Sequence, residues 1–471
     1  MKFGNQLFSM QKKSSLQFNE FSEISEEQWN EKISKEIKGS SIEDISTRID
    51  TISILPFYTN SINESEKFFQ TKNESNHTVL LREKFSDFHT DNSIEKINTA
   101  IEGGIKSIIL SGSCNQVKLA AQKLPEQNIQ LSFDITDNVQ LFLTSTPFIF
   151  SDKISYLLEH DPISQFAQSG RWLVSKKDDF VALENTFEYI REHNLPIQKS
   201  VHVNASIYHN AGAGFIQELS FSLAHAHEYI VYLLEHGFKI EEIISKIQFT
   251  FSVGTDYFAE IAKLRAFQIL WANLIRAYHY KIDACPCYIH AETSRRYHTV
   301  KDEHTNILRT TTQAMSALIG GCNTLSILPF NSLKNADEFS RRIARNTGNI
   351  LFHEASFSSY PNIANGSYFI ESLTTEFTKK AWLFFKEIEK SGGLVESLSK
   401  NEIQDEIKKN REKELQEYKI GKRILMGINK YETLIEQSEA IHYTPSITTD
   451  TNAKSFKECR IAELIERDEK K

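Results

Sequence analysis

The chain alternates short apolar, β-branched segments with longer segments of helical periodicity over about residues 75–355. Such alternation implies parallel strands that are joined by helical crossovers. An eighth strand is expected within Val139–Phe150, and eight strands favour a closed barrel over an open sheet. We therefore predict an α/β fold, a (β/α)8 TIM barrel. The seven segments that predict the other strands are Ile105–Ser111, Ile129–Asp134, Arg171–Ser175, Ser200–Asn204, Ile247–Val253, Cys285–Ala291 and Cys322–Leu328.

Both ends of the chain lie outside the barrel pattern. Ser25 can cap an amphipathic helix that Gly39 ends, so the N-terminus is predicted to form a helical arm. Gly366–Lys390 and Lys400–Tyr418 predict the helices of a C-terminal extension. The expected parts are an arm at 1–60, a barrel at 61–360, C-terminal helices packed on the barrel at 361–431, and a polar tail at 432–471.

Composition excludes several classes of partner. The formal net charge of −8, from 54 basic and 62 acidic residues, argues against nucleic acid or an anionic membrane. No apolar stretch reaches the roughly 20 residues that a membrane span needs. Five cysteines in 471 residues fit a reducing cytoplasm better than a disulfide framework. The sequence therefore predicts a cytoplasmic protein that binds neither nucleic acid nor membrane.

Several blocks, in this order, resemble methylmalonyl-CoA mutase, and most resemble its small, non-catalytic subunit. The N-terminal run through Leu55–Tyr58 resembles the family's arm, and Val201–Ile230 resembles the barrel segment that carries the substrate-side histidine. The order and spacing of the blocks carry the resemblance more than any one of them. The others are Gly254–Ala272, His290–Ser294, Asn306–Thr310, Ser340–Thr347, Asn365–Thr374 and Gly427–Tyr431.

The resemblance implies a barrel that takes an acyl-CoA along its axis and an arm that wraps a partner subunit. In the family, adenosylcobalamin supplies the radical for the rearrangement. The cobalamin-binding, flavodoxin-like domain would follow Gly427–Tyr431, and too few residues remain to form it. The expected arrangement is therefore a heterodimer in which a large subunit holds adenosylcobalamin and this chain binds no cofactor.

Working residues of the family are replaced in this chain. With the register set on Ala211–Ala213, Ile207 stands where a catalytic chain has histidine, and isoleucine has no donor and no titrating group. By the resemblance, Lys246 stands at a pocket arginine, and Glu292 stands at a glutamine. These replacements predict a chain that is not catalytic. If a vestigial substrate pocket survives, His290, Thr293 and Ser294 are expected to line it.

Other interpretations stay open on the sequence. A register error of one or two residues would bring Tyr208 or His209 to the site. Cys285 and Cys287 with His290 make a poor zinc set, because structural zinc takes four ligands. The chain as a whole is also compatible with an active barrel whose cobalamin domain is a separate chain, or with a scaffold or regulator that binds CoA.

The state of the barrel interior depends on Ile247–Val253, which reads IQFTFSV. If Phe249 and Phe251 point inward, they plug the axis. If the alternate residues Gln248, Thr250 and Ser252 point inward, the axis can stay open. A shift of one residue exchanges the two faces, so the sequence leaves this choice undecided.

Overall fold

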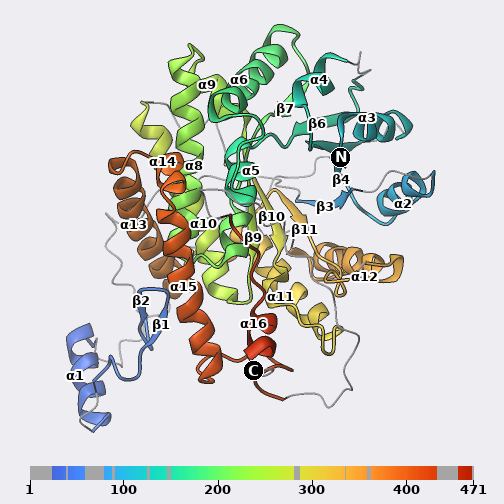
Figure 1. Ribbon diagram of the computed structural model, residues 1–471. Coiled ribbons are helices and arrows are strands. Elements are labelled where there is room, and N and C mark those ends of the chain that lie inside the picture. The colour runs from blue at the N-terminus through green and yellow to red at the C-terminus, as the bar shows by residue number, and fades with distance from the viewer. Residues whose placement is uncertain are drawn as a thin grey trace, which may run out of the picture. The chain divides into compact units, whose positions relative to one another are not determined.

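The computed structural model describes residues 24–38, 41–58, 79–86, 91–124, 128–145, 150–279, 287–334, 336–357, 362–431 and 455–468 (Figure 1). The chain divides into two compact units, Met1–Ser61 and Ile62–Lys471. In the part of the chain that is described, no helix is both long enough and apolar enough to cross a membrane.

The first unit holds one helix and one hairpin. Helix α1 (Glu26–Glu36) begins as predicted at Ser25, whose hydroxyl accepts from the Gln28 amide in a capping box. The predicted end at Gly39 lies outside the described residues. Strands β1 (Thr47–Ile49) and β2 (Ile52–Ile54) pair antiparallel. Within this unit the rings of Trp29 and Phe57 lie 5.3 Å apart at their centroids.

The second unit is the predicted barrel. Its strands form one parallel sheet in the order β7-β6-β5-β4-β3-β11-β10-β9-β8. Only Ser200 separates β7 from β8, so these two segments share one strand position. The Ser200 amide donates to the Lys246 carbonyl and the His202 amide to the His160 carbonyl, which ties this position to both neighbours. The sheet thus closes with eight positions. The strands are β3 (Leu80–Phe85), β4 (Ser107–Gly112), β5 (Ile129–Ile135), β6 (Ile154–Leu158), β7 (Ile197–Lys199), β8 (Val201–Asn204), β9 (Ile247–Val253), β10 (Ile289–Thr293) and β11 (Thr324–Ser326).

Helices surround the strands, and the C-terminal helices pack on this outer layer. In Figure 1, α13 runs beside α8 and α10, as their contacts also show. Its buried stripe includes Leu373, Phe377 and Ala381, at the spacing that the sequence predicts. The helices are α2 (Asp91–Glu102), α3 (Cys114–Lys123), α4 (Val139–Thr144), α5 (Pro162–Ser169), α6 (Lys176–Glu192), α7 (Ser206–Ala211), α8 (Phe215–Glu235), α9 (Ile240–Lys246), α10 (Tyr257–Ala277), α11 (Thr305–Gly320), α12 (Glu338–Asn349), α13 (Tyr368–Lys390), α14 (Leu394–Ser399), α15 (Glu402–Lys419) and α16 (Ile461–Asp468), with short turns at η3 (Arg295–Tyr297) and η4 (Ile350–Glu354).

Two predicted strands are wrong. Arg171–Ser175 is a loop, in which the Asp179 carboxylate accepts from the Leu173 and Val174 amides at 2.7 and 3.1 Å. Val139–Phe150 contains α4 instead, because the Asn138 side chain caps a helix there. Their places in the barrel are taken by β3 and β6. Strand β3 lacks the apolar pattern by which strands were predicted, because it reads LLREKF and carries charged residues on its inward face.

Candidate functional site in the barrel interior

Strand β9 shows which face of a strand points into the barrel. Phe249 packs against Phe267 and Trp271 of α10, with ring centroids 4.7 and 4.9 Å apart, and Phe251 packs against Phe267 at 4.6 Å. Helix α10 lies outside the barrel, so both phenylalanines point away from the axis. The alternate residues of the strand, which include Thr250, therefore face the interior. Of the two arrangements that the sequence left open, the structure has the polar one.

The barrel interior is polar, whereas TIM barrels are typically filled by Val, Ile and Leu. Its side chains come from every strand position and hydrogen-bond to one another across strands. An interior of this kind cannot be held together by apolar packing alone, so its charges and hydrogen bonds decide its shape. These residues include Arg82, Lys84, Ser107, Ser111, Gln130, Ser132, Asp134, Glu159, His202, Thr250, His290, Glu292, Thr324 and Ser326.

At the centre lies a buried network around Glu159. Its carboxylate accepts from the Arg82 guanidinium at 2.7 Å and from the Ser132 hydroxyl at 2.5 Å. His202 Nδ1 lies 3.0 Å from the other carboxylate oxygen, and His202 Nε2 is 2.8 Å from the Thr250 hydroxyl. Arg82 belongs to β3 and Glu159 follows β6, three strand positions further on. Their ion pair therefore crosses the interior.

The charges of this network support one another. Burial alone would raise the pKa of Glu159, but attraction to His202 and Arg82 outweighs it and holds the pKa well below its usual range. Burial alone would lower the pKa of His202, but the Glu159 carboxylate outweighs it and raises the pKa. The Glu159 carboxylate thus lies between the Arg82 guanidinium and an imidazole whose charged form it favours.

His290, which is fully enclosed, is in the opposite state. Its Nδ1 is 2.9 Å from the Thr324 hydroxyl and its Nε2 is 3.3 Å from the Ser326 hydroxyl. Burial and repulsion from Arg82 hold its pKa well below the usual value, so this imidazole is neutral near pH 7. The neighbours of His202 and His290 therefore shift the pKa values of these two histidines in opposite directions.

Closer to the carboxyl ends of the strands lies a second charged group. Lys84 Nζ and the Ser111 hydroxyl both donate to Asp134 Oδ2, at 2.8 and 2.7 Å. Burial raises the pKa of Glu292, although Arg295 and Lys84 attract its charge. Glu292 thus adds a carboxyl group to a region that already holds Asp134.

At the amino ends of the strands the interior closes in a different way. The Tyr288 hydroxyl, just before β10, donates to Gln130 of β5 at 2.9 Å, and Ser107 donates to the same amide oxygen at 2.8 Å. Strands β5 and β10 stand four positions apart, on opposite sides of the barrel. Outside this bridge lies a cavity of about 460 Å³, whose lining includes Gln130, Lys106 and Lys153.

Some polar atoms of the interior have no hydrogen-bond partner. Arg82 Nε and Nη1 and Gln248 Oε1 are buried and unsatisfied. Leaving such donors and acceptors unpaired is costly, so groups of this kind normally meet water or a ligand. The centre of the barrel therefore has unpaired donors and acceptors beside its ion pair, and these can bind water or another small polar molecule.

Helix α7, at the carboxyl end of β8, contains Ile207, Tyr208 and His209, the residues that the alternative registers would bring to the site. Ile207 is buried there. The Tyr208 hydroxyl is 3.1 Å from His225 Nδ1, and its ring packs on Phe221 and Phe456. His209 Nε2 is 2.9 Å from the Ser294 hydroxyl. Tyr208 and His209 are therefore both engaged in structural contacts.

The other candidate residues lie in two places. His290, Glu292, Thr293 and Ser294 lie on or just after β10, but they do not share a face, since the Thr293 hydroxyl accepts from the Leu328 amide. Lys246 lies at the opposite end of the barrel, where it precedes β9 and donates to the Ile197 carbonyl. Burial lowers the pKa of Lys246. The structure does not bring Lys246 together with the residues of β10.

The sequence did not single out Arg82, Glu159 or Tyr288. Residues 60–200 carry only a vague resemblance to the family, and no motif of the sequence marks these three residues. The one available signal was the alternation in LLREKF, where Arg82 and Lys84 occupy one face of a short strand. Alternating charge on a strand next to apolar neighbours indicates a polar barrel interior.

In the described part of the chain, His209, the histidine whose sequence context is nearest to that of a cobalt ligand, does not fit that role. The chain's one His-x-x-Gly sequence is His209–Gly212. His209 is buried in α7, with one ring nitrogen at Ser294 and the other 3.6 Å from Glu218. An imidazole with both nitrogens occupied offers nothing to a cobalt ion. Within the described ranges no group of three metal-ligating side chains occurs. Cys285, one of the three residues considered as zinc ligands, lies outside these ranges.

Comparison with known proteins gives the family. The family described as Methylmalonyl-CoA mutase matches residues 139–471, which is more than half of the chain. The chain belongs to the methylmalonyl-CoA mutase family. This confirms the resemblance that the ordered blocks indicate.

Relatives named methylmalonyl-CoA mutase small subunit are similar along much of the chain. The Porphyromonas gingivalis protein is 29% identical over 446 residues, which cover 89% of this chain and 71% of that protein. The Streptomyces virginiae protein is 33% identical over 294 residues, covering 61% and 46%. The Propionibacterium freudenreichii protein is 38% identical over 205 residues, covering 43% and 32%. The chain thus spans about half or less of the length of several relatives that it matches.

Proposed function

We propose that this chain is the small, non-catalytic subunit of a heterodimeric, adenosylcobalamin-dependent methylmalonyl-CoA mutase. Its large subunit would hold the cofactor and interconvert methylmalonyl-CoA and succinyl-CoA. The small-subunit names of three relatives support the assignment to a two-subunit enzyme. The sparse and odd cysteine set supports a cytoplasmic location.

The observation that carries the non-catalytic part is that side chains of strands three and four positions apart meet inside the barrel. The Tyr288–Gln130 hydrogen bond crosses near the amino ends, and the Arg82–Glu159 ion pair crosses near the centre. An eight-stranded barrel has an interior only just wide enough for its own side chains. Two such bridges occupy the axis along which an acyl-CoA would have to pass.

The chemistry of the carboxyl end supports the same conclusion. Ile207 offers no proton or hydrogen bond, and Glu292 adds a carboxyl group near Asp134. An anionic acyl group would be repelled by these carboxylates. The side chains that would have to grip such a group are also committed, since His209 bonds to Ser294 and His290 bonds to Thr324.

Residual acyl-CoA binding is proposed only at the amino end of the barrel. The cavity of about 460 Å³ there is large enough for part of a CoA, and Lys106 and Lys153 supply positive charge for phosphates. Gln130, which lines this cavity, also accepts the hydrogen bond of the Tyr288–Gln130 bridge across the barrel. A CoA bound there would therefore stabilise the chain without reaching a reacting group.

The N-terminal unit supplies a surface that suits a partner. Its helix α1 has no buried residue, and Ile24, Trp29, Leu55 and Phe57 are exposed apolar side chains. Exposed apolar patches of this kind mark protein interfaces. We propose that this arm binds the large subunit, as the resemblance implies.

The test is co-expression of this chain with the large subunit from the same genome. We expect the two chains to co-purify, and the purified small chain to show no mutase activity when adenosylcobalamin is added. The double variant Trp29→Ala, Phe57→Ala should reduce co-purification. The matched control Lys32→Ala alters an exposed i,i+4 ion pair on the same helix and should not.

Mutase activity of this chain with a separate cobalamin-binding chain, and without a large subunit, would establish the alternative of an active barrel. Failure to bind the large subunit together with tight CoA binding would instead favour a free-standing CoA-binding regulator. Restoring histidine by Ile207→His should not restore turnover, because both bridges remain in the interior.

A further inference from the structure

The last described segment, Ser455–Asp468, lies across the carboxyl end of the barrel. The Phe456 amide donates to the Ala167 carbonyl of α5, and the Cys459 amide donates to the Asn210 carbonyl of α7, both at 2.8 Å. Arg296 of η3 donates to the Cys459 carbonyl at 3.0 Å. Helices α5 and α7 and the turn η3 follow β6, β8 and β10. The segment therefore spans the ends of three strand positions (Figure 1).

Apolar side chains anchor the segment at both ends. Phe456 packs edge-on against Tyr208 at a centroid distance of 5.7 Å. Ile461 and Ala462 of α16 are fully buried in a cluster with Tyr418 and Leu425. Tyr418 and Leu425 precede residues 432–454 and α16 follows them, so the two sides of this stretch meet in one core. This closeness favours a contact of the segment with its own chain.

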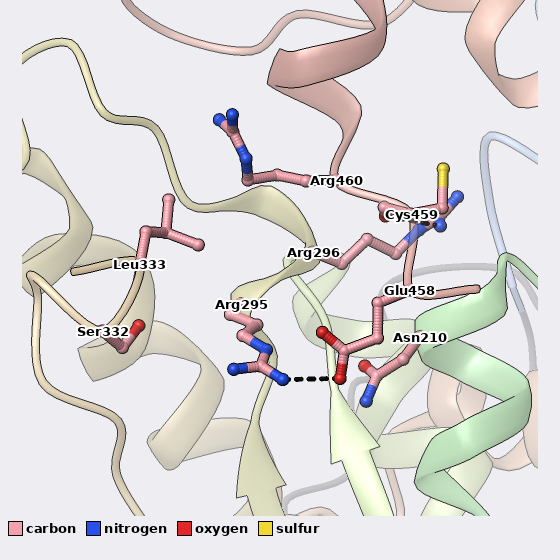
Figure 2. Close-up of a pocket in the computed structure, with 8 residues that line it drawn as sticks. All are labelled: Asn210, Arg295, Arg296, Ser332, Leu333, Glu458, Cys459 and Arg460. Atoms are coloured by element: carbon pink, nitrogen blue, oxygen red, sulfur yellow. Dashed lines mark hydrogen bonds and ion pairs between the residues drawn. The ribbon is translucent and has the colours of Figure 1, made fainter. Parts of the chain in front are cut away.

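Charged groups add a weaker latch between the anchors. Glu458 pairs with Arg295 at 2.5 Å, and both side chains remain more than a third exposed (Figure 2). Arg296 is buried and pairs with Glu414 of α15 while it donates to the Cys459 carbonyl. The segment thus supplies acceptors to two successive arginines of the barrel.

Little space is left beneath the segment. The cavity there has a volume of about 80 Å³, and the segment itself supplies Glu458, Cys459 and Arg460 to its lining (Figure 2). Ligand pockets usually hold roughly 300–1,000 Å³, and a water molecule occupies about 30 Å³. The covered face therefore has room for a few waters and not for an organic ligand.

We propose that Ser455–Asp468 is a strap that the chain lays across the carboxyl end of its own barrel. The strap closes to other molecules the face on which barrel enzymes build their active sites. This proposal does not depend on the proposed function, because the strap would close that face whether or not the chain binds a large subunit.

Cys459 is a built-in reporter of the strap, since it is buried in the segment. The experiment follows the reaction of the intact chain with N-ethylmaleimide, resolved by peptide mass spectrometry. In the unaltered chain Cys459 should be protected like the buried barrel residue Cys322. Phe456→Ala should accelerate labelling of Cys459 by at least about tenfold, as expected for loss of a buried aromatic anchor.

Two further variants separate strap opening from unfolding. Glu458→Arg opposes Arg295 without touching a core residue and should accelerate labelling of Cys459 by a smaller factor. Lys457→Ala changes an exposed neighbour in the same segment and should have no effect. In every variant the labelling of Cys322 should stay unchanged. A cysteine introduced by Asn210→Cys, on the barrel side of the cavity, should become reactive only when the strap is loosened.

Three results would overturn the proposal. The first is rapid labelling of Cys459 in the unaltered chain. The second is that neither Phe456→Ala nor Glu458→Arg accelerates Cys459 more than Cys322. The third is protection that is lost on dilution, which would show that the segment is exchanged with a second copy and does not close its own barrel.

Discussion

The two ends of the barrel differ in what closes them. At the amino end, an open cavity of about 460 Å³ reaches the Tyr288–Gln130 bridge, which belongs to the strands themselves. At the carboxyl end, about 80 Å³ remains beneath a segment that comes from far along the chain. Between them lies the Arg82–Glu159–His202 network. A barrel of the methylmalonyl-CoA mutase family thus combines a polar interior with side-chain bridges across it and a segment over its carboxyl end.

This difference indicates which obstructions can be removed. The central network and the amino-end bridge are part of the barrel's own interior, so altering them tests stability as well as access. The strap contacts the barrel from outside through a few side chains, so it can be loosened without altering a strand. Disturbing the central network should therefore lower the free energy of unfolding most, and disturbing the strap should lower it least.

The largest effect is expected at Glu159. Glu159→Gln would leave the Arg82 guanidinium buried without its anion and His202 without the carboxylate that favours its charged form. Removing one partner of a buried ion pair destabilises a protein by about 3–5 kcal/mol. Urea unfolding monitored by circular dichroism should show a loss of this size.

The matched control is Glu188→Gln, which removes one partner of the Arg191–Glu188 pair on the surface of α6, where both side chains are 45% exposed. Surface pairs of this kind contribute about 0–1 kcal/mol. Equal losses in the two variants would mean that the Glu159 network does not hold the two sides of the barrel together.

The next effect concerns acid. Burial, with repulsion from Arg309, Arg295 and Arg460, lowers the pKa of His298 to about 3, and burial lowers that of His160 to about 4. A histidine whose pKa is depressed by folding stabilises the folded state above its unfolded pKa of about 6.5 and loses that contribution as pH falls. His202, whose pKa is raised, has the opposite dependence. Its contribution to stability is present at low pH and is lost as pH rises.

His298→Gln should therefore flatten the acid side of the stability curve. At pH 4 the unaltered chain should have lost about 3 kcal/mol through His298 alone, at 1.36 kcal/mol for each pKa unit. Unfolding free energies measured between pH 4 and 7 check this, with His193→Gln as the control, since that side chain lies exposed at the end of α6. Parallel curves for His298→Gln and the unaltered chain would contradict the prediction.

A smaller effect is expected at the amino-end bridge. Tyr288→Phe removes the hydroxyl that donates to Gln130 but keeps the ring. Net loss of one hydrogen bond destabilises by about 1 kcal/mol. Because the ring still crosses the barrel, access from the amino-end cavity should not change, and CoA titrations of the two forms by calorimetry should agree. Tighter CoA binding to Tyr288→Phe would show that the hydroxyl alone closes the interior.

The sequence predicted several elements that have a strong apolar face, but it missed strand β6, which is apolar, and strand β3, which carries charges on one face. Strand β9 and helix α13 were found because their outward or inward faces are runs of Phe, Leu and Val. Strand β3 was missed because Arg82 and Lys84 face the interior, where an apolar residue is the usual expectation. The predicted strand at Arg171–Ser175 failed because a single side chain, Asp179, takes its backbone amides.

The candidate site was harder to predict because it depends on contacts that the sequence does not bring close. Arg82 and Glu159 are 77 residues apart, and they meet only because the sheet curls into a barrel that brings strands three positions apart together. The strap holds to the barrel by two short apolar anchors within a polar tail. The replacements at Ile207 and Glu292 were visible through the family resemblance, but the bridges that occupy the axis were not.

The smallest effect is expected at the latch of the strap. Glu458→Gln removes the partner of Arg295 in a pair that is largely open to solvent, which contributes about 0–1 kcal/mol. At low salt the variant should label at Cys459 only a few times faster than the unaltered chain. At about 1 M salt the Debye length falls to roughly 3 Å, so the two forms should label at equal rates. The buried anchors Phe456 and Ile461 are not screened by salt, so both forms should remain far slower than an exposed thiol. If salt alone freed Cys459 completely, the ion pair would be the main attachment of the strap. The carboxyl end of the barrel would then be closed less firmly than the amino end, where the Tyr288–Gln130 bridge crosses.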